Sequence, residues 1–308
     1  MSNKVYEIVT DQIIRQLEEG TVPWHKPWKW GSGFSFSGST AGPVNLATKK
    51  PYRGINIFLL LCTPYESPYW VSIKQANKLG GRVRKDEKSS MVIFWKPLEV
   101  EDKENKNEDG TPKKKTIPLL RYYRVFNVEQ CEGLESKIPQ PPEPEPEAPE
   151  PEPFQPIECC EKVVEGMPNR PEIRHKEARA YYRPSEDFVN LPKQELFESP
   201  EEYYSTAFHE LTHSTGHKSR LARPEITKGL IVFGSHDYSK EELVAEMGAA
   251  FLCGHCQIEQ KTLYNSAAYI QGWLKKLRDD RKLVVHAAAA AQRAADYILG
   301  KEVKNYES

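Results

Sequence analysis

The residues of this 308-residue chain best suited to chemistry are two histidines four positions apart, His209 and His213, with a glutamate directly after the first. On an α-helix, residues four apart lie on one face, so both imidazoles can bind the same metal ion. Glu210 can then reach a water molecule on that ion. In the zinc motif His-Glu-x-x-His the glutamate is a general base and not a ligand. The stretch therefore predicts a Zn²⁺ site in which Glu210 is the catalytic base.

A catalytic zinc ion needs a third protein ligand and an open position for water. A third histidine ten residues after the first is absent, because that position is a serine. Downstream, Glu242 and Glu246 share one face of a predicted helix, which a capping box at Ser239 is expected to begin. We interpret Glu242 as the third ligand and Glu246 as the residue that holds a histidine ligand from outside. Glu241 and His217 remain alternative ligands.

Such a site predicts hydrolysis of a peptide bond. Glu210 would take the proton of the water as it attacks the carbonyl carbon. The sequence does not choose the group that stabilises the oxyanion, for which Tyr238, His236 and His217 are candidates. Residues 172–175 and 178–183 are predicted to form a pair of strands ahead of the helix. That pair either offers backbone groups to an extended peptide or forms a structural sheet edge.

Residues 139–156 alternate proline with glutamate, which cannot form a core and favours an extended polyproline II spacer. This linker divides the chain into predicted domains of residues 1–138 and 157–308.

Six cysteines without framework spacing predict a reducing, cytoplasmic setting. No apolar run approaches the ~20 residues needed to span a bilayer, so we expect no membrane contact.

The first predicted domain is moderately basic, with 22 Lys and Arg against 16 Asp and Glu, and its cations lie close to aromatic residues. Cations can follow phosphates while flat side chains stack on unpaired bases, so single-stranded nucleic acid is the predicted partner. The residues predicted to contact it are Trp24, Lys26, Trp28, Tyr52, Arg53, Lys74, Arg82, Arg84, Lys85, Arg121 and Arg124. Trp70, Trp95 and Phe94 lie in apolar runs and are expected in the core.

The pattern predicts an α+β N-terminal domain and a mostly helical C-terminal domain with a small sheet. In the first, we expect helices at 1–20 and 72–79, and strands at 90–100 and 117–128 joined by a charged, disordered loop at 101–116. In the second, helices at 263–277 and 282–299 are expected to close the domain.

The chain resembles the ArdC-type antirestriction proteins of conjugative plasmids and phages, whose N-terminal module also occurs in related plasmid primases. The resemblance rests on the Trp24–Trp28 loop, residues 43–45, 51–56, 73–76 and 80–81, and in the second half on residues 180–184, 203–206, 208–217, 220–221 and 241–252. It implies an N-terminal domain that binds single-stranded DNA and a C-terminal zincin-like metallopeptidase domain. It also implies protection of incoming DNA from host restriction. The long acidic linker is the main departure.

Two hypotheses follow. In the first, the chain is a zinc endopeptidase that its own N-terminal domain brings to single-stranded DNA, and its protein substrate, which is unknown, is associated with DNA. In the second, it is a non-catalytic protein that shields single-stranded DNA, and the zincin-like domain is structural or vestigial. A protein that mimics DNA would need a strongly acidic surface, which the basic N-terminal domain excludes.

Overall fold

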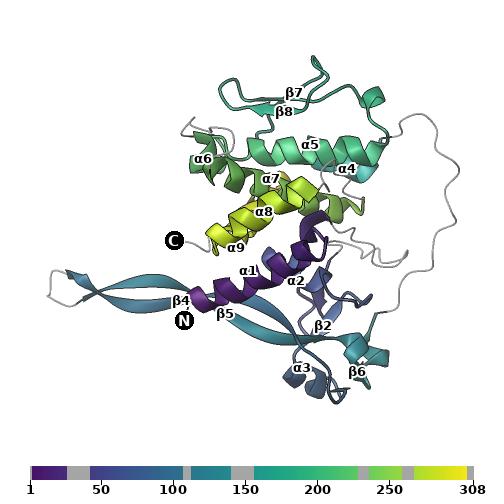
Figure 1. Ribbon diagram of the computed structural model, residues 1–308, viewed down its shortest axis with the longest axis vertical. Coiled ribbons are helices and arrows are strands. Elements are labelled where there is room, and N and C mark those ends of the chain that lie inside the picture. The colour runs from purple at the N-terminus through teal and green to yellow at the C-terminus, as the bar shows by residue number, and fades with distance from the viewer. Residues whose placement is uncertain are drawn as a thin grey trace, which may run out of the picture.

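The computed structural model describes residues 2–25, 42–106, 112–139, 156–227, 236–258 and 267–303. Lys26, Trp28 and most of the proline–glutamate linker lie outside these residues. Figure 1 shows helices α5, α7, α8 and α9 stacked in one half of the molecule, with the long β4–β5 hairpin on the other side. Within the part of the chain so described, none of the helices combines the length and apolar character that crossing a bilayer requires.

The first half of the chain mixes short helices with an antiparallel hairpin. Its elements are α1 (Ser2–Glu18), η1 (Pro23–His25), β1 (Val44–Asn45), α2 (Ile55–Leu61), β2 (Tyr69–Val71), α3 (Ile73–Lys78), β3 (Arg82–Val83), β4 (Ser90–Lys106), β5 (Pro112–Asn127), η2 (Val128–Gln130), β6 (Cys131–Glu132) and η3 (Glu135–Lys137). The main sheet has the order β1-β2-β5-β4, and β3 pairs with β6. The predicted helices at 1–20 and 72–79 are confirmed by α1 and α3.

The β4–β5 hairpin is longer than the sequence suggested. Its ladder runs from Ser90 opposite Val125 to Asp102 opposite Lys113 and, after an irregularity, to Lys106 opposite Pro112. The prediction of a disordered loop at 101–116 is therefore wrong for most of that segment. The backbone register continues without a break from Ser90 as far as Asp102, so the strand does not end where the run of charged residues begins.

The second half of the chain is mostly helical, which confirms the predicted fold class. Its elements are α4 (Glu158–Glu165), β7 (Glu172–Arg174), β8 (Tyr181–Arg183), β9 (Phe188–Asn190), η4 (Gln194–Leu196), α5 (Pro200–Ser214), α6 (Pro224–Thr227), α7 (His236–Cys256), α8 (Ala267–Asp279) and α9 (Leu283–Ile298). The predicted strands β7 and β8 exist but do not pair with each other. Both pair with β9, β7 in parallel and β8 antiparallel, and a three-residue strand is too short to leave a clear pattern.

The starts of α5 and α7 set where the metal-binding residues lie. The Ser199 side chain accepts a hydrogen bond from the backbone N–H of Glu202, Pro200 occupies the first turn, and acidic residues follow, all features that favour a helix start.

The predicted start of the next helix at Ser239 is wrong. Helix α7 begins at His236, and Ser239 lies buried inside it.

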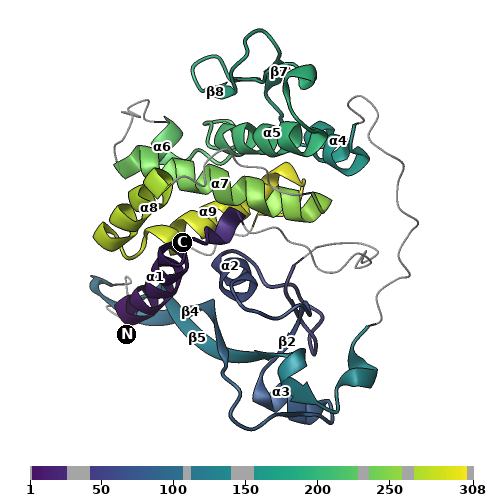
Figure 2. The ribbon, with the colours of Figure 1, turned by 45° about the vertical axis from the view of Figure 1, so that its right-hand side comes forward.

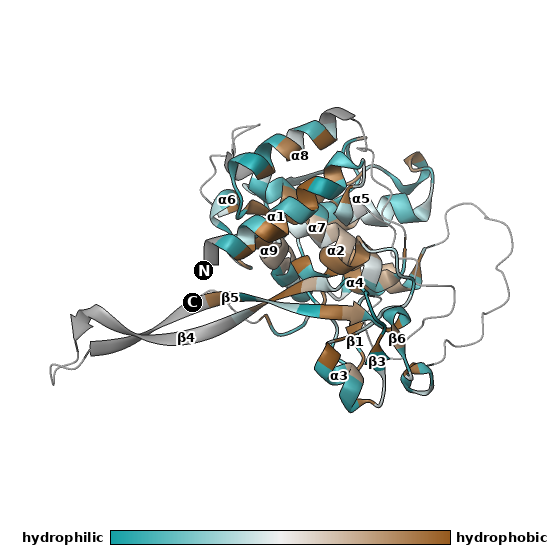
Figure 3. Cartoon of the chain, turned by 60° about the horizontal axis from the view of Figure 1, so that its bottom comes forward, coloured by the Kyte–Doolittle hydropathy of each residue, from teal (hydrophilic) through white to brown (hydrophobic). Residues whose placement is uncertain are grey.

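The two halves of the chain share one hydrophobic core. The largest buried cluster includes side chains of α1, α2, α5, α7 and α9, and the rings of Phe58 and Phe251 stack with centroids 5.1 Å apart. Figure 2 shows α1 beside α8 and α9, and Figure 3 shows the hydrophobic residues of α2 in the middle of the protein. Helices from both sides of the linker therefore hold the metal-binding helices in place.

Candidate metal centre

Helices α5 and α7 bring together the three residues that the sequence proposed as metal ligands. One ligand atom from each of His209, His213 and Glu242 lies within 4.8 Å of the other two. The two Nε2 atoms are 3.2 Å apart, His209 Nε2 is 3.3 Å from Glu242 Oε1, and His213 Nε2 is 3.8 Å from Glu242 Oε2. No other such group occurs among the residues that the structure describes.

These separations fit a tetrahedral divalent cation. Zinc binds imidazole nitrogen and carboxylate oxygen at about 2.0–2.2 Å, so neighbouring donors in a tetrahedron are about 3.4 Å apart. The distances from His209 Nε2 to His213 Nε2 and to Glu242 Oε1 are close to this value, and the other carboxylate oxygen of Glu242 lies slightly further from His213 Nε2. Two imidazoles and one carboxylate are also a common set of protein ligands in catalytic zinc sites, where the fourth position is left for water. The residues therefore fit the ion that the sequence predicted.

His209 and Glu242 form an ion pair. Burial lowers the pKa of His209, but the hydrogen bond and charge of Glu242 outweigh this and raise it to about 9. Burial raises the pKa of Glu242, but the hydrogen bond and charge of His209 lower it to about 2. Because a histidine ligand must be neutral, a cation that binds here displaces the proton of His209.

Glu210, the predicted general base, lies beside the ligands on α5. Glu210 is 8% exposed. Its negative charge helps to raise the pKa of His209, although less than the charge of Glu242 does. The carboxylate is thus close to the ligand set but is not part of it, as the role of a base requires.

The outer contact to a histidine ligand comes from Glu241. Its Oε1 lies 3.2 Å from His213 Nδ1, which leaves Nε2 for the cation. Arg223 donates to both carboxylate oxygens, at 2.9 and 2.5 Å, and also to the carbonyl oxygen of Thr212 at 2.9 Å. Burial raises the pKa of Glu241, but Arg223 and His213 lower it overall. Glu241 therefore stays ionised and fixes the orientation of His213.

Glu246 has a different position from the one predicted. Its Oε2 accepts hydrogen bonds from Trp24 Nε1, at 2.9 Å, and from the hydroxyl of Tyr269. The outer contact to His213 is therefore that of Glu241, while the charge of Glu246 adds to the raised pKa of His209. Adjacent helix residues point about 100° apart, so Glu242 faces the ligands and Glu241 faces Arg223. Glu246 lies one turn further along, beside Trp24.

His217, the alternative ligand, belongs to another polar cluster. Its Nδ1 lies 2.8 Å from Ser219 Oγ and 3.8 Å from Asp187 Oδ2. Arg220 donates to the same Asp187 carboxylate. Sequence reasoning missed Arg223 and Tyr269, and no spacing or motif marks either of them.

Gly248 allows α5 and α7 to approach closely enough for the three ligands to meet. A Cβ atom at this position would lie 2.4 Å from Thr212 Cγ2 and 2.7 Å from Thr212 Oγ1. Thr212 directly precedes His213 and is fully buried. Any side chain at Gly248 must push the two helices apart or displace Thr212.

We expect Gly248→Ala to lower the free energy of unfolding by about 1–3 kcal/mol, the usual cost of overpacking, and to weaken metal binding. Gly272→Ala is the matched control, because a Cβ atom there meets nothing within 4 Å and alanine favours a helix by up to about 1 kcal/mol. Urea denaturation and metal titration of both variants check this. Equal stability of the two variants would contradict the close approach.

Two residues predicted to contact nucleic acid are buried. Trp24 is 0% exposed and packs edge-on against Phe58 and Trp273. Tyr52 is 6% exposed, and its hydroxyl accepts a hydrogen bond from Asn45. Neither ring can stack on a base, so both predictions are corrected.

The cations predicted to contact nucleic acid divide into two sets. Arg53, Arg82 and Arg84 form ion pairs with Asp296, Glu132 and Glu87. All seven of these cations are exposed, because Lys74, Lys85, Arg121 and Arg124 lie at the surface as the three ion-paired arginines do.

An exposed aromatic group on the β4–β5 hairpin was predicted only in part, because Arg121 was expected to contact nucleic acid and Phe94 was not. Phe94 and Tyr123 are 47% and 48% exposed, and their ring centroids lie 5.5 Å apart. Arg121 is the Cα partner of Phe94, so it shares their side of the sheet. We call Phe94, Arg121 and Tyr123 the aromatic face. The prediction that Phe94 lies in the core is wrong.

Two family models match the chain. The model of the N-terminal domain of the anti-restriction factor ArdC matches residues 3–126, and a zincin-like metallopeptidase model matches residues 162–290. Together they include the aromatic face and all three proposed ligands.

Among relatives, two Escherichia coli proteins named DNA primase TraC are 36% identical over 314 and 313 residues, or 98% of this chain. The chain spans only 28% and 20% of their lengths. Protein y4eC of Sinorhizobium fredii is 33% identical over 301 residues, 96% of this chain and 91% of y4eC.

Crystal structures of the antirestriction protein ArdC from plasmid R388 have a similar fold. The metal-free form gives a TM-score of 0.68 at 36% identity and covers 96% of each chain. The Mn(II)-bound form gives a TM-score of 0.69 at 35% identity, and the match covers 96% of this chain and 97% of the ArdC chain.

Proposed function

Because this chain belongs to the ArdC family of antirestriction proteins, we propose that it binds single-stranded DNA and hydrolyses peptide bonds at a zinc centre. The observation that carries the enzymatic part is the convergence of His209, His213 and Glu242 beside Glu210. The proposed setting is the cytoplasm, where the chain would protect incoming DNA from restriction.

In the proposed reaction, His209, His213 and Glu242 hold the ion, and Glu241 keeps His213 oriented toward it. Bound Zn²⁺ supplies Lewis-acid activation of a water molecule and of the peptide carbonyl. Glu210 accepts the proton of the attacking water and can pass it to the leaving amine. The Mn(II)-bound ArdC structure supports a divalent cation in this family, and the nitrogen-rich donor set favours zinc.

The aromatic face supports the DNA-binding part of the proposal. Phe94 and Tyr123 expose flat rings beside Arg121, the combination that binds unpaired bases and a phosphate. Lys74, Lys85 and Arg124 are further exposed cations that can follow the backbone. This part requires none of the metal ligands.

A hydrogen bond links the N-terminal segment to the metal-binding helix. Trp24 Nε1 donates to Glu246, which lies one turn after Glu242 on α7. A change in the N-terminal half on binding DNA can therefore reach the metal centre through buried contacts. We accordingly propose a peptidase directed by DNA, with this buried contact as a physical connection between the two halves.

The proposed function is tested by measuring bound metal and DNA affinity on the same purified protein. We expect one zinc ion per chain, tighter binding to single-stranded than to duplex DNA, and an affinity that falls steeply with added salt. Cleavage of a denatured protein should require the metal. Equal affinity for both forms of DNA would remove the stacking argument, and cleavage without metal would remove the zinc mechanism.

A further inference from the structure

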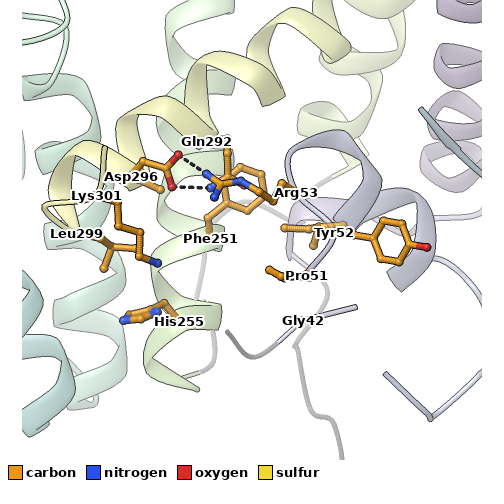
Figure 4. Close-up of a pocket in the computed structure, with 12 residues that line it drawn as sticks. Gly42, Pro51, Tyr52, Arg53, Phe251, His255, Gln292, Asp296, Leu299 and Lys301 are labelled. Atoms are coloured by element: carbon orange, nitrogen blue, oxygen red, sulfur yellow. Dashed lines mark hydrogen bonds and ion pairs between the residues drawn. The ribbon is translucent and has the colours of Figure 1, made fainter. Parts of the chain in front are cut away.

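A small cavity lies where the two halves of the chain meet, away from the metal ligands. Its volume is about 60 Å³, several times the roughly 10–15 Å³ that holding one water requires. The loop before α2, the end of α7 and the segment around the end of α9 line it (Figure 4). Its polar side chains are Arg53, His255, Gln292, Asp296 and Lys301.

The polar lining is mostly basic. Asp296 is its single acid, and its side chain is 8% exposed. Arg53 donates to one Asp296 oxygen, and Gln292 donates to the other at 3.3 Å. The Arg53 side chain is 51% exposed. An arginine has five N–H donors in a planar fork, so its ion pair with Asp296 leaves donors for a ligand.

One ring nitrogen of His255, which lines this cavity, is buried without a hydrogen-bond partner in the part of the chain that the structure describes. Its Nδ1 is one of three buried side-chain nitrogen or oxygen atoms without a partner among the described residues. Figure 4 shows the Lys301 side chain extending toward His255. Burial lowers the pKa of His255, and the positive charge of Lys301 lowers it further. Burial also lowers the pKa of Lys301, and the negative charge of Asp296 offsets only part of that decrease. The basic groups thus disfavour each other's charge, and an anion would relieve this.

We propose that this cavity binds a phosphate group of nucleic acid. The anion would accept hydrogen bonds from Arg53, Lys301 and His255, and would thereby give the buried His255 nitrogen a partner. The neighbouring surface supports a nucleic-acid source. Tyr52, which precedes Arg53, lines the cavity, and its ring centroid is 6.4 Å from that of Phe94 on the aromatic face. The identity of the source rests on the DNA binding proposed above.

The test uses the full chain and two oligothymidylates that are identical except for a 5′-phosphate or a 5′-hydroxyl. Lys301→Ala removes a phosphate donor without touching the core. Arg53→Gln combined with Asp296→Asn removes the arginine charge but leaves the net charge unchanged. Lys275→Ala is the matched control, because Lys275 is exposed on α8 outside the cavity. Inorganic phosphate serves as the probe without DNA.

We expect Lys301→Ala and the double variant to weaken binding about tenfold, the loss of one charged hydrogen bond, and Lys275→Ala to change it little. A loss with both oligonucleotides supports an internal phosphodiester, and a loss confined to the phosphorylated one supports a terminal phosphate. Affinities equal to that of the control for both would overturn the proposal.

Calorimetry with inorganic phosphate separates failure of this inference from failure of DNA binding. If the wild type bound neither oligonucleotide, the proposed DNA-binding function would fail. Phosphate binding that Lys301→Ala abolishes would still support an anion site in the cavity. Absence of phosphate binding to the wild type would overturn the site as well.

Discussion

Glu210→Gln is expected to lower peptide-bond hydrolysis by about 10²–10⁴-fold, the contribution of a positioned general base. Glutamine keeps the size of the side chain but cannot accept the proton of the attacking water. Metal content should stay at one ion per chain, because Glu210 is not among the three grouped ligands. Affinity for single-stranded DNA should also be unchanged, since the aromatic face lies on β4 and β5.

Cleavage of a denatured protein, with and without single-stranded DNA, measures this effect. Glu201→Gln is the matched control, because Glu201 lies in the first turn of the same helix. Wild-type hydrolysis by Glu210→Gln would contradict the assigned base. If the variant loses hydrolysis but still protects DNA from restriction, shielding by the DNA-binding half is the better explanation of the biological effect.

Replacing both rings of the aromatic face, Phe94→Ala with Tyr123→Ala, is expected to weaken binding of single-stranded DNA by about 10²-fold or more. Stacking on an aromatic ring contributes about 1–3 kcal/mol per base, and both rings are about half exposed. Because every base has a flat face that can stack on an aromatic ring, the loss of affinity should be similar for mixed-sequence and homopolymeric strands. Arg121→Ala should instead reduce the salt dependence of binding.

Fluorescence anisotropy at fixed salt measures these affinities. Tyr122→Ala is the matched control, since Tyr122 is 46% exposed but alternates to the other side of β5. Circular dichroism shows whether each variant is folded. An equal effect of Tyr122→Ala and the double variant would contradict an assignment to one side of the hairpin.

The histidine pair was predictable because its geometry is local, whereas Glu242 joins it from a second helix further along the sequence. Positions 209 and 213 share a face of any helix, and so do 242 and 246. The roles of Glu241 and Glu246 were not predictable, because they depend on what packs against α7. Arg223, which holds Glu241, comes from the segment after α5, and Trp24, which holds Glu246, lies 222 positions away in the sequence.

The nucleic-acid residues were harder to predict, because an aromatic residue beside a lysine can lie in the core or on the surface. Trp24 lies inside because Trp273 and Glu246, from helices after the linker, contact it. Tyr52 lies inside a separate cluster of N-terminal residues. Phe94 lies on the β4–β5 hairpin and is 47% exposed. The proline–glutamate linker suggested two domains, one on each side of it. The apolar side of α1 nevertheless packs on α8 and α9, a long-range contact that no local pattern encodes.

Metal affinity of wild type and Glu242→Ala tests most directly whether two helices supply three ligands to one cation. The wild type should bind one Zn²⁺ or Mn²⁺ per chain. The variant should bind it more than about 100-fold more weakly, beyond the 10–100-fold that loss of an outer contact costs. Glu246→Gln, one turn along the same helix, should retain the metal. Wild-type affinity in Glu242→Ala would contradict the proposed centre.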